Sequence, residues 1–340
     1  MSWASIRGHR DWVQAFQQVH QQGKLAHAYA FLGPSGVGKR RFAFELAKAL
    51  CCEQPPNGDL EACDRCPACL QVEAGMHPDV SNFRLPEDKQ EFPIALIQEL
   101  IQALALKPAR GGRKVVIVDD ADLFNEEAAN CALKTLEEPP PQSLLILIGV
   151  SGDHFLATIL SRCQQIRFGP LPDADIRDLL VAEGAELPAD QWPIVLGAAR
   201  GSLGQARLLL DDSVRQFRSD WLARWAGQRL DSVALAEKLV KFVAEAGKEG
   251  AAKRQRAALI VGFLTELFET ALRFRLLGVP AGQGASPTGV LAQRLEATTL
   301  SRLIDRCLEA EHHIERRLQL DLSLEAWVDA LAQEMSGRGP

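Results

Sequence analysis

The segment Gly33–Lys39, Gly-Pro-Ser-Gly-Val-Gly-Lys, has the composition of a phosphate-binding loop. Its glycines, which include Gly36 and Gly38, allow backbone N–H groups to turn toward phosphate oxygens, and Lys39 can reach the β- and γ-phosphates. In a nucleotide hydrolase the next residue is Ser or Thr, whose hydroxyl binds Mg²⁺. Here that residue is Arg40, which cannot bind a cation. The loop is therefore expected to hold a nucleotide without hydrolysing it efficiently.

A second candidate for the nucleotide site is Asp119. The apolar run 115–118 predicts a buried strand that ends in Asp119-Asp120, where P-loop proteins place the carboxylate that holds Mg²⁺. Hydrolases usually have Glu at the second position to orient the attacking water, and Asp120 is one methylene shorter. The alternative is a pair of acids at the start of a helical turn, where the helix dipole favours negative charge.

Five of the eight cysteines fall between residues 51 and 69. Four of them have the spacing Cys-x₁₀-Cys-x₂-Cys-x₂-Cys, which suits a tetrahedral thiolate site and, most simply, a structural Zn²⁺. The predicted ligands are Cys52, Cys63, Cys66 and Cys69. Cys51 is the alternative to Cys52, and an iron–sulfur cluster or unligated thiols are the alternative states. The segment Glu53–Asp59 has no core-forming residues, so a metal would supply its order.

The remaining cysteines are isolated in the sequence, which predicts buried, small apolar residues rather than ligands. They are Cys131, Cys163 and Cys307.

The composition is that of a globular protein with two or three domains. The chain has 340 residues, 47% hydrophobic and 24% charged. A net charge of −6 argues against a strongly basic protein that binds nucleic acid alone. The apolar runs are too short to span a bilayer and the first residues lack an apolar signal core, so we expect a cytoplasmic protein without a membrane partner.

Up to Phe168 the pattern alternates strands with helices, which is typical of a parallel α/β sheet. The predicted strands are Ala28–Leu32, Val80–Leu85, Lys114–Val118, Leu144–Gly149 and Gln165–Phe168. The predicted helices are Arg10–Gln22, Arg40–Cys51, Ile94–Leu106, Asn125–Glu137 and His154–Leu160. The glycines and Lys39 thus lie between a strand and a helix, as phosphate binding requires.

Beyond the joint Gly169–Pro172 no strand pattern recurs, and Ala174–Leu210 is expected to form a small helical unit. Long amphipathic helices follow, with Gly278–Thr288 as a flexible loop between two of them. These helices are Ser232–Ala246, Ala251–Leu277, Leu300–Leu318 and Leu322–Met335. We therefore predict a nucleotide-binding domain at 1–169 with a metal module at 52–69, a helical lid at 170–210 and a helical domain at 211–340.

The string Glu127–Pro140, Glu-Ala-Ala-Asn-Cys-Ala-Leu-Lys-Thr-Leu-Glu-Glu-Pro-Pro, resembles the AAA+ subunits of DNA-polymerase clamp loaders. The cysteine insertion after the P-loop helix and the tripeptide Ser161-Arg162-Cys163 fit the same family. The resemblance is most specific to the delta-prime family of the bacterial DNA polymerase III complex. It covers roughly residues 1–210, and the last third matches as a helical collar, which is an oligomerisation domain.

This resemblance implies an AAA+ P-loop domain with a zinc-binding insertion, a helical lid and an all-helical collar. It implies that Arg162 acts in trans as an arginine finger, a permanently charged fork that stabilises charge on the γ-phosphate in a neighbouring subunit. The implied partners in DNA replication are the delta and gamma/tau subunits. The sliding clamp and primer–template DNA are implied partners through the complex.

Three positions depart from the pattern of the family's ATP-hydrolysing motor subunits. Arg40 replaces the hydroxyl residue, Asp120 replaces the glutamate, and Gly204 replaces the arginine that senses nucleotide from the lid. We therefore expect a non-motor subunit of the polymerase holoenzyme whose P-loop holds ATP or ADP, with weak or absent ATPase of its own.

Two alternatives remain. One is a gamma/tau-type motor subunit that hydrolyses ATP. The other is a zinc-containing protein that binds DNA alone, for which the basic stretch 107–114 is a candidate patch. That stretch precedes a buried strand and is better interpreted as a solvated turn.

Overall fold

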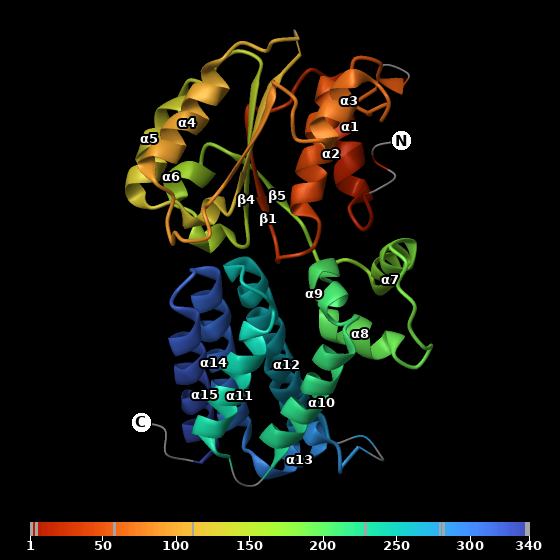
Figure 1. Cartoon of the computed structure of the whole chain (residues 1–340), viewed down its shortest axis with the longest axis vertical. Coiled ribbons are helices and arrows are strands. Elements are labelled where there is room, and N and C mark those ends of the chain that lie inside the picture. Colours follow the sequence, from red (N-terminus) through yellow and green to blue (C-terminus); the bar gives the residue numbers. More distant parts are fainter. Residues whose placement is uncertain are drawn as a thin grey trace. The chain divides into compact units, whose positions relative to one another are not determined.

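The computed structural model describes residues 3, 6–56, 59–110, 112–227, 230–278, 280 and 283–336. These residues form two compact units (Figure 1). The first comprises Met1–Leu179 with Gly201–Gly204, and the second comprises Leu180–Arg200 with Gln205–Pro340. The division into three domains stays a prediction.

The first unit contains a five-stranded parallel sheet with the order β2-β3-β4-β1-β5. Its strands are β1 (Ala28–Leu32), β2 (Val80–Arg84), β3 (Lys114–Asp119), β4 (Ser143–Gly149) and β5 (Gln164–Arg167). The three central strands are buried along their whole length, as continuous apolar runs covered on both faces should be. The parallel sheet and the helical second unit confirm the predicted fold class.

Helices cover both faces of this sheet (Figure 1). On one face, α1 (Arg10–Gln21) and α2 (Lys39–Cys51) pack over an aromatic cluster. In that cluster the ring of Phe168 lies 5.1 Å from Phe31 and 5.2 Å from Phe42, centroid to centroid. This packing joins the end of β1 to α2, the two elements that flank the phosphate-binding loop.

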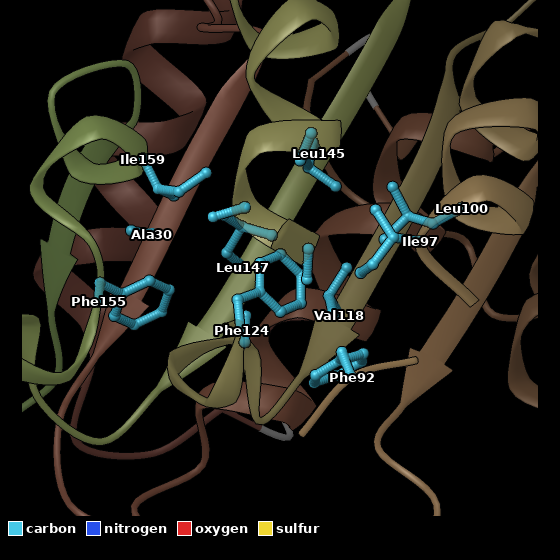
Figure 2. Packing of buried hydrophobic residues seen from close by; sticks show 14 of the residues in the cluster. Ala30, Phe92, Ile97, Leu100, Val118, Phe124, Leu145, Leu147, Phe155 and Ile159 are labelled. Atoms are coloured by element: carbon cyan, nitrogen blue, oxygen red, sulfur yellow. The ribbon is translucent and has the colours of Figure 1, made fainter. Parts of the chain in front are cut away.

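The opposite face carries α4 (Ile94–Ala105), α5 (Glu126–Glu137) and the short α6 (Ala157–Leu160). Figure 2 shows their core, in which Phe124, Leu147 and Val118 lie between the helices and the strands. The rings of Phe92 and Phe124 meet edge to face with their centroids 4.8 Å apart. The loops after β2 and β3 are thereby held against the sheet.

The predicted helix His154–Leu160 is wrong in its first half. The structure has a 3₁₀ turn, η4 (Gly152–His154), and α6 begins only at Ala157. Phe155 separates the two because its backbone is extended, with φ −85° and ψ 148°, and its side chain is buried in the core shown in Figure 2. A continuous helix would lose that packing.

The cysteine-rich segment contains a helix that the sequence analysis did not predict, α3 (Pro67–Glu73). Cys66 caps its N-terminus through the sulfur, which accepts from the Cys69 N–H, and Pro67 occupies the first turn. Asn57 and Gly58, part of the predicted metal-ordered segment, lie outside the described residues.

In the second unit the described residues form helices only, as predicted. α7 (Asp173–Ala182) and α9 (Leu203–Leu208) cross the division between the units. The remaining helices are α8 (Trp192–Ala199), α10 (Asp212–Ala226), α11 (Ser232–Ala244), α12 (Gly250–Leu277), α13 (Pro287–Arg294), α14 (Ala297–Glu315) and α15 (Leu320–Met335). None of the described helices is both long enough and apolar enough to cross a membrane.

The second unit is organised around α12, which packs along α14 and α13. Trp221 and Trp225 of α10 are fully buried in this unit. The predicted loop Gly278–Thr288 is shorter than expected because α13 begins at Pro287, after the Ser286 side chain caps it. Residues 279, 281 and 282 of that loop lie outside the described residues.

Candidate nucleotide and metal sites

The phosphate-binding loop connects the end of β1 to the start of α2. Gly36 and Gly38 have φ of +79° and +100°, in the left-handed region that favours glycine. A Cβ on Gly36 would lie 2.2 Å from the Ser202 hydroxyl, whereas a Cβ on Gly38 would have no atom of a described residue within 4 Å. Gly36 is thus required for close packing as well as conformation, and Gly38 for conformation alone.

Lys39 begins α2 and is almost completely buried. Its ammonium donates to the carbonyl oxygens of Gly33 at 2.5 Å and Pro34 at 2.7 Å. The positive charge expected to meet phosphates therefore lies within the loop. To contact a phosphate, Lys39 must exchange these carbonyl oxygens for phosphate oxygens.

The segment Gly201–Gly204, where motor subunits of the resembling family carry a sensing arginine, lies directly on the loop. The Leu203 N–H donates to the Gly36 carbonyl at 3.1 Å, and the Gly204 nitrogen lies 3.1 Å from the position of a Gly36 Cβ. Gly204 brings no side chain to a nucleotide, so this contact supplies packing only.

Arg40 forms an ion pair with Asp119, whose carboxylate was predicted to hold Mg²⁺. Its Nε is 3.0 Å from Asp119 Oδ2, at the end of β3, and its Cζ is 5.5 Å from the centroid of the Phe44 ring. The contact is an ion pair without hydrogen-bond alignment, since Oδ2 has no hydrogen-bond partner among the residues that the structure describes. Burial raises the pKa of Asp119, while the Arg40 charge opposes that rise. The positive charge beside the Asp119 carboxylate is thus the Arg40 side chain of the same protein.

Asp120 is directed elsewhere. Its φ of +58° turns the chain after β3, and its Oδ2 lies 3.7 Å from Arg84 Nε on β2. The alternative interpretation, an acid pair that caps a turn, fits in part, because Asp120 precedes the 3₁₀ turn η3 (Ala121–Leu123) but makes no capping hydrogen bond. Asp122 has the structural role, as it accepts from the Val150 N–H at 2.7 Å.

The four predicted metal ligands lie together, with their sulfurs all within 4.8 Å of one another. Four Zn–S bonds of about 2.3 Å separate tetrahedral sulfurs by about 3.8 Å, so the site needs only a small contraction. Three of the sulfurs accept backbone N–H groups at 3.3–3.4 Å: Cys52 from Cys63, Cys63 from Cys66, and Cys66 from Cys69. Such donors favour the thiolate, the form that binds metal. The donor set is compatible with zinc.

Cys51 lies apart from this cluster. Its thiol is 3.9 Å from the Arg113 carbonyl, and burial raises its pKa to about 12. The Cys63 thiol has the opposite tendency, because hydrogen bonds from the backbone N–H groups of Arg65 and Cys66 lower its pKa to about 6. Of the two adjacent cysteines, Cys52 is the one near the other three sulfurs. Elsewhere, Cys163 and Cys307 are buried and Cys131 is half-buried.

Arg162 lies between α6 and β5 with about a third of its side chain exposed. Its Nη1 donates to the Thr158 carbonyl at 2.9 Å, and its Nη2 donates to the Glu137 carboxylate at 2.5 Å. Glu137 is itself half exposed at the end of α5. The guanidinium is therefore held at the surface by partners that water can replace.

Comparison with known proteins identifies the region that contains these sites. A family model described as "DNA polymerase III, delta subunit" matches residues 8–172. The matched region, residues 8–172, is thus similar to that family. It includes the phosphate-binding loop, all four clustered cysteines, Asp119 and Arg162.

The curated relatives are also subunits of DNA polymerase III. DNA polymerase III subunit delta' of Pseudomonas aeruginosa is 36% identical over 212 residues, which are 61% of this chain and 63% of that protein. The delta' subunit of Bacillus subtilis is 35% identical over 48% of each chain. The tau subunit of Bacillus subtilis is 31% identical over 64% of this chain and 38% of that protein. The chain thus spans between about a third and two thirds of these relatives.

The resemblance to delta-prime subunits stated from the sequence is confirmed by these matches. The sequence analysis missed an ion cluster, centred on the buried Lys48 and Glu45, that joins the two sites within the matched region. Lys48 of α2 lies 2.9 Å from Asp64, 3.0 Å from Glu73 and 3.1 Å from Glu45. Burial disfavours its charge, but the hydrogen bonds to these carboxylates raise the pKa of Lys48 overall.

Arg41 extends the cluster by pairing with Glu45 and Glu73. The cluster ties α3 and the loop between the cysteines to the P-loop helix. The i, i+3 spacing of Glu45 and Lys48 was visible in the sequence, but their burial was not.

Proposed function

We propose that this chain is a non-motor subunit of the DNA polymerase III clamp loader. It assembles with the delta and gamma/tau subunits to load the sliding clamp on primer–template DNA, and it donates Arg162 in trans to a neighbouring ATP site. The observation that carries the proposal is a contrast within one domain. Arg162 is presented at the surface, whereas the carboxylate of the chain's own metal position is paired with Arg40.

Arg162 has the properties that a finger needs. Its guanidinium is permanently charged and presents a fork of donors that matches phosphate oxygens. Its partner Glu137 is half exposed, and such surface pairs contribute only about 0–1 kcal/mol. Exchanging that carboxylate for a γ-phosphate in a partner subunit therefore costs little.

The test is a reconstituted loader that contains the wild-type chain or Arg162→Ala. We expect the variant to fold and assemble, and hydrolysis at the adjacent ATP site to fall by about 10³-fold, as for other arginine fingers. The rate of the whole complex falls less, because the remaining ATP sites keep their own groups. Arg167→Ala, which removes an exposed arginine on β5, is the matched control. An assembled Arg162→Ala loader with unchanged DNA-stimulated ATPase would refute the role.

The second candidate is a motor subunit, favoured by the intact loop glycines, by Lys39 and by the similarity to a tau subunit. It requires turnover by the isolated chain that disappears in Lys39→Ala. We expect no measurable turnover, because the group that would bind Mg²⁺ is absent and Asp119 is paired with Arg40.

A protein that binds DNA alone is less well supported. Within the basic stretch, Arg110 pairs with Glu53 at 2.6 Å, and Lys114 donates to the Pro78 carbonyl beside the buried Asp79. These charges are largely neutralised within the chain. Tight, salt-sensitive binding of the isolated chain to primed DNA would favour this candidate instead.

A further inference from the structure

We propose that the Arg40 guanidinium takes the place of the divalent cation in the phosphate-binding loop. The site would then bind a nucleoside di- or triphosphate equally well with and without Mg²⁺. This inference concerns the P-loop of the isolated chain and does not depend on the proposed role of Arg162.

Arg40 places a positive charge beside Asp119, the carboxylate that would otherwise face Mg²⁺. In a metal-dependent P-loop the residue after the lysine supplies a neutral hydroxyl, and the strand-end carboxylate directs its negative charge to Mg²⁺. Here the residue after Lys39 is itself a cation, and its Nε lies 3.0 Å from Asp119 Oδ2. The same carboxylate therefore has a positive partner on the P-loop helix. A divalent cation that approached it would meet a like charge.

Arg40 keeps hydrogen-bond donors that its contact with Asp119 does not use. Its Nε faces Asp119, and the Phe44 ring one turn along α2 lies 5.5 Å from Cζ. Among the residues that the structure describes, none accepts a hydrogen bond from either Nη atom of Arg40. Those two groups form a planar fork suited to phosphate oxygens. Arg40 is also half exposed, so a ligand can reach it.

Other positive groups lie close to Arg40. Lys39 and Arg40 are consecutive in the first turn of α2, where backbone N–H groups also point outward and favour anions. Two cationic side chains and these N–H groups provide the positive charge that a polyphosphate otherwise receives in part from Mg²⁺. The arrangement thus supports phosphate binding while omitting the metal that hydrolysis requires.

The next residue along the helix provides a matched control. Arg41 is as exposed as Arg40, at 48% and 50% of the side chain, but it pairs with Glu45 and Glu73 instead of Asp119. Arg41→Thr removes the same charge without freeing the Asp119 carboxylate. Arg40→Thr removes the charge, frees the carboxylate and restores a hydroxyl.

The experiment is titration of the full chain with ADP by calorimetry, once in EDTA and once in MgCl₂. For the wild-type chain and for Arg41→Thr we expect dissociation constants in the two buffers that agree within about twofold. For Arg40→Thr we expect binding at least tenfold weaker in EDTA and largely restored by MgCl₂. Electron spin resonance with Mn²⁺ and ADP should detect protein-bound metal in Arg40→Thr and not in the wild-type chain.

Three results would overturn the inference. The first is a wild-type dissociation constant for ADP that is tenfold lower in MgCl₂ than in EDTA. The second is an Arg40→Thr dissociation constant that is the same in both buffers. The third is the absence of ADP binding by the wild-type chain at millimolar concentration. If Arg40→Thr fails to fold, the wild-type comparison alone still decides, because it needs no variant. None of these results bears on the Arg162 experiment in the reconstituted loader, so the two proposals can fail separately.

Discussion

One helix joins two sites that differ in what they retain. At the N-terminal end of α2, the glycines that shape the phosphate loop are intact, but Arg40 takes the position of a metal-binding hydroxyl. At the C-terminal end, all four thiols are present and lie within 4.8 Å of one another. The loop is supported by the packed sheet, so its shape does not depend on a metal.

The cysteine module has less apolar support of its own. Its own buried cluster consists of two alanines and two cysteines, Ala62, Cys66, Ala68 and Cys69. We expect that so small a cluster, together with the ion pairs to α2, leaves part of the entropy of ordering the segment to be offset by a bound metal. The comparison teaches that one helix can begin at a site whose shape needs no metal and end at a module that we expect to need its metal for order.

The sharpest test of this contrast is Cys69→Ser. Structural zinc contributes on the order of 10 kcal/mol to small thiolate modules, so we expect loss of bound zinc and rapid hydrogen exchange in α3, while the strands of the sheet stay protected. Zinc stoichiometry and hydrogen exchange measured by mass spectrometry check this. Cys51→Ser is the control and should retain zinc, because the Cys51 thiol faces the Arg113 carbonyl. Zinc loss in Cys51→Ser, or global unfolding of Cys69→Ser, would contradict the contrast.

A smaller effect is expected for Lys48→Met, which removes the buried cation from the link between the two sites. Removing one partner of a buried ion pair leaves the other charge uncompensated, at a cost of about 3–5 kcal/mol. Arg41 still pairs with Glu45, so we expect about 3 kcal/mol of lost stability in the α2–α3 region. The readout is the protection of α3 amides.

Lys24→Met, at an exposed lysine, is the control. Replacing Glu45 by Met as well should recover most of the loss, since no buried carboxylate then lacks its partner. No recovery in the double variant would mean that the effect comes from packing rather than charge.

Substitutions at Gly36 and Gly38 distinguish the cost of a positive φ from the cost of a steric clash. Gly36→Ala should cost about 2 kcal/mol and Gly38→Ala about 1 kcal/mol, because both adopt positive φ but only Gly36 touches Ser202. Thermal unfolding of the variants measures the difference. Adding Ser202→Ala to Gly36→Ala should remove most of that difference, because the Gly204 backbone remains close to the new Cβ. Equal losses at both glycines would show that Gly201–Gly204 does not press on the loop.

The smallest expected effect is a pH dependence at Glu73. The hydrogen bond from Lys48 lowers the pKa of Glu73. A carboxyl with a depressed folded pKa stabilises fully above its unfolded value, about 4.3, and that contribution is lost as the pH falls through the folded pKa.

The protection of α3 should therefore decline as the pH falls below about 4.3, by less than about 1 kcal/mol because Glu73 is half exposed. Glu73→Gln should flatten this decline. Identical profiles for the two proteins would assign the decline to other groups.

Much of the fold could be predicted because it depends on local patterns. The apolar runs placed all five strands to within about one residue, as a strand buried on both faces must be apolar throughout. The helix predicted from His154 failed at Phe155, where a core contact outweighs helical periodicity. The helix α3 was missed because its seven residues are too few for periodicity to be recognised.

The sequence by itself determined the strand–glycine loop–helix unit, the four-cysteine spacing and the family resemblance carried by the Ser161-Arg162-Cys163 tripeptide. These features depend on residues near one another in the chain. Only the tertiary structure decided that Arg40 pairs with Asp119, that Arg162 meets Glu137, and that Lys48 joins α2 to the cysteine module. Each pair joins segments far apart in sequence, and charges reveal their partners only when strand order and helix packing bring them within a few ångströms.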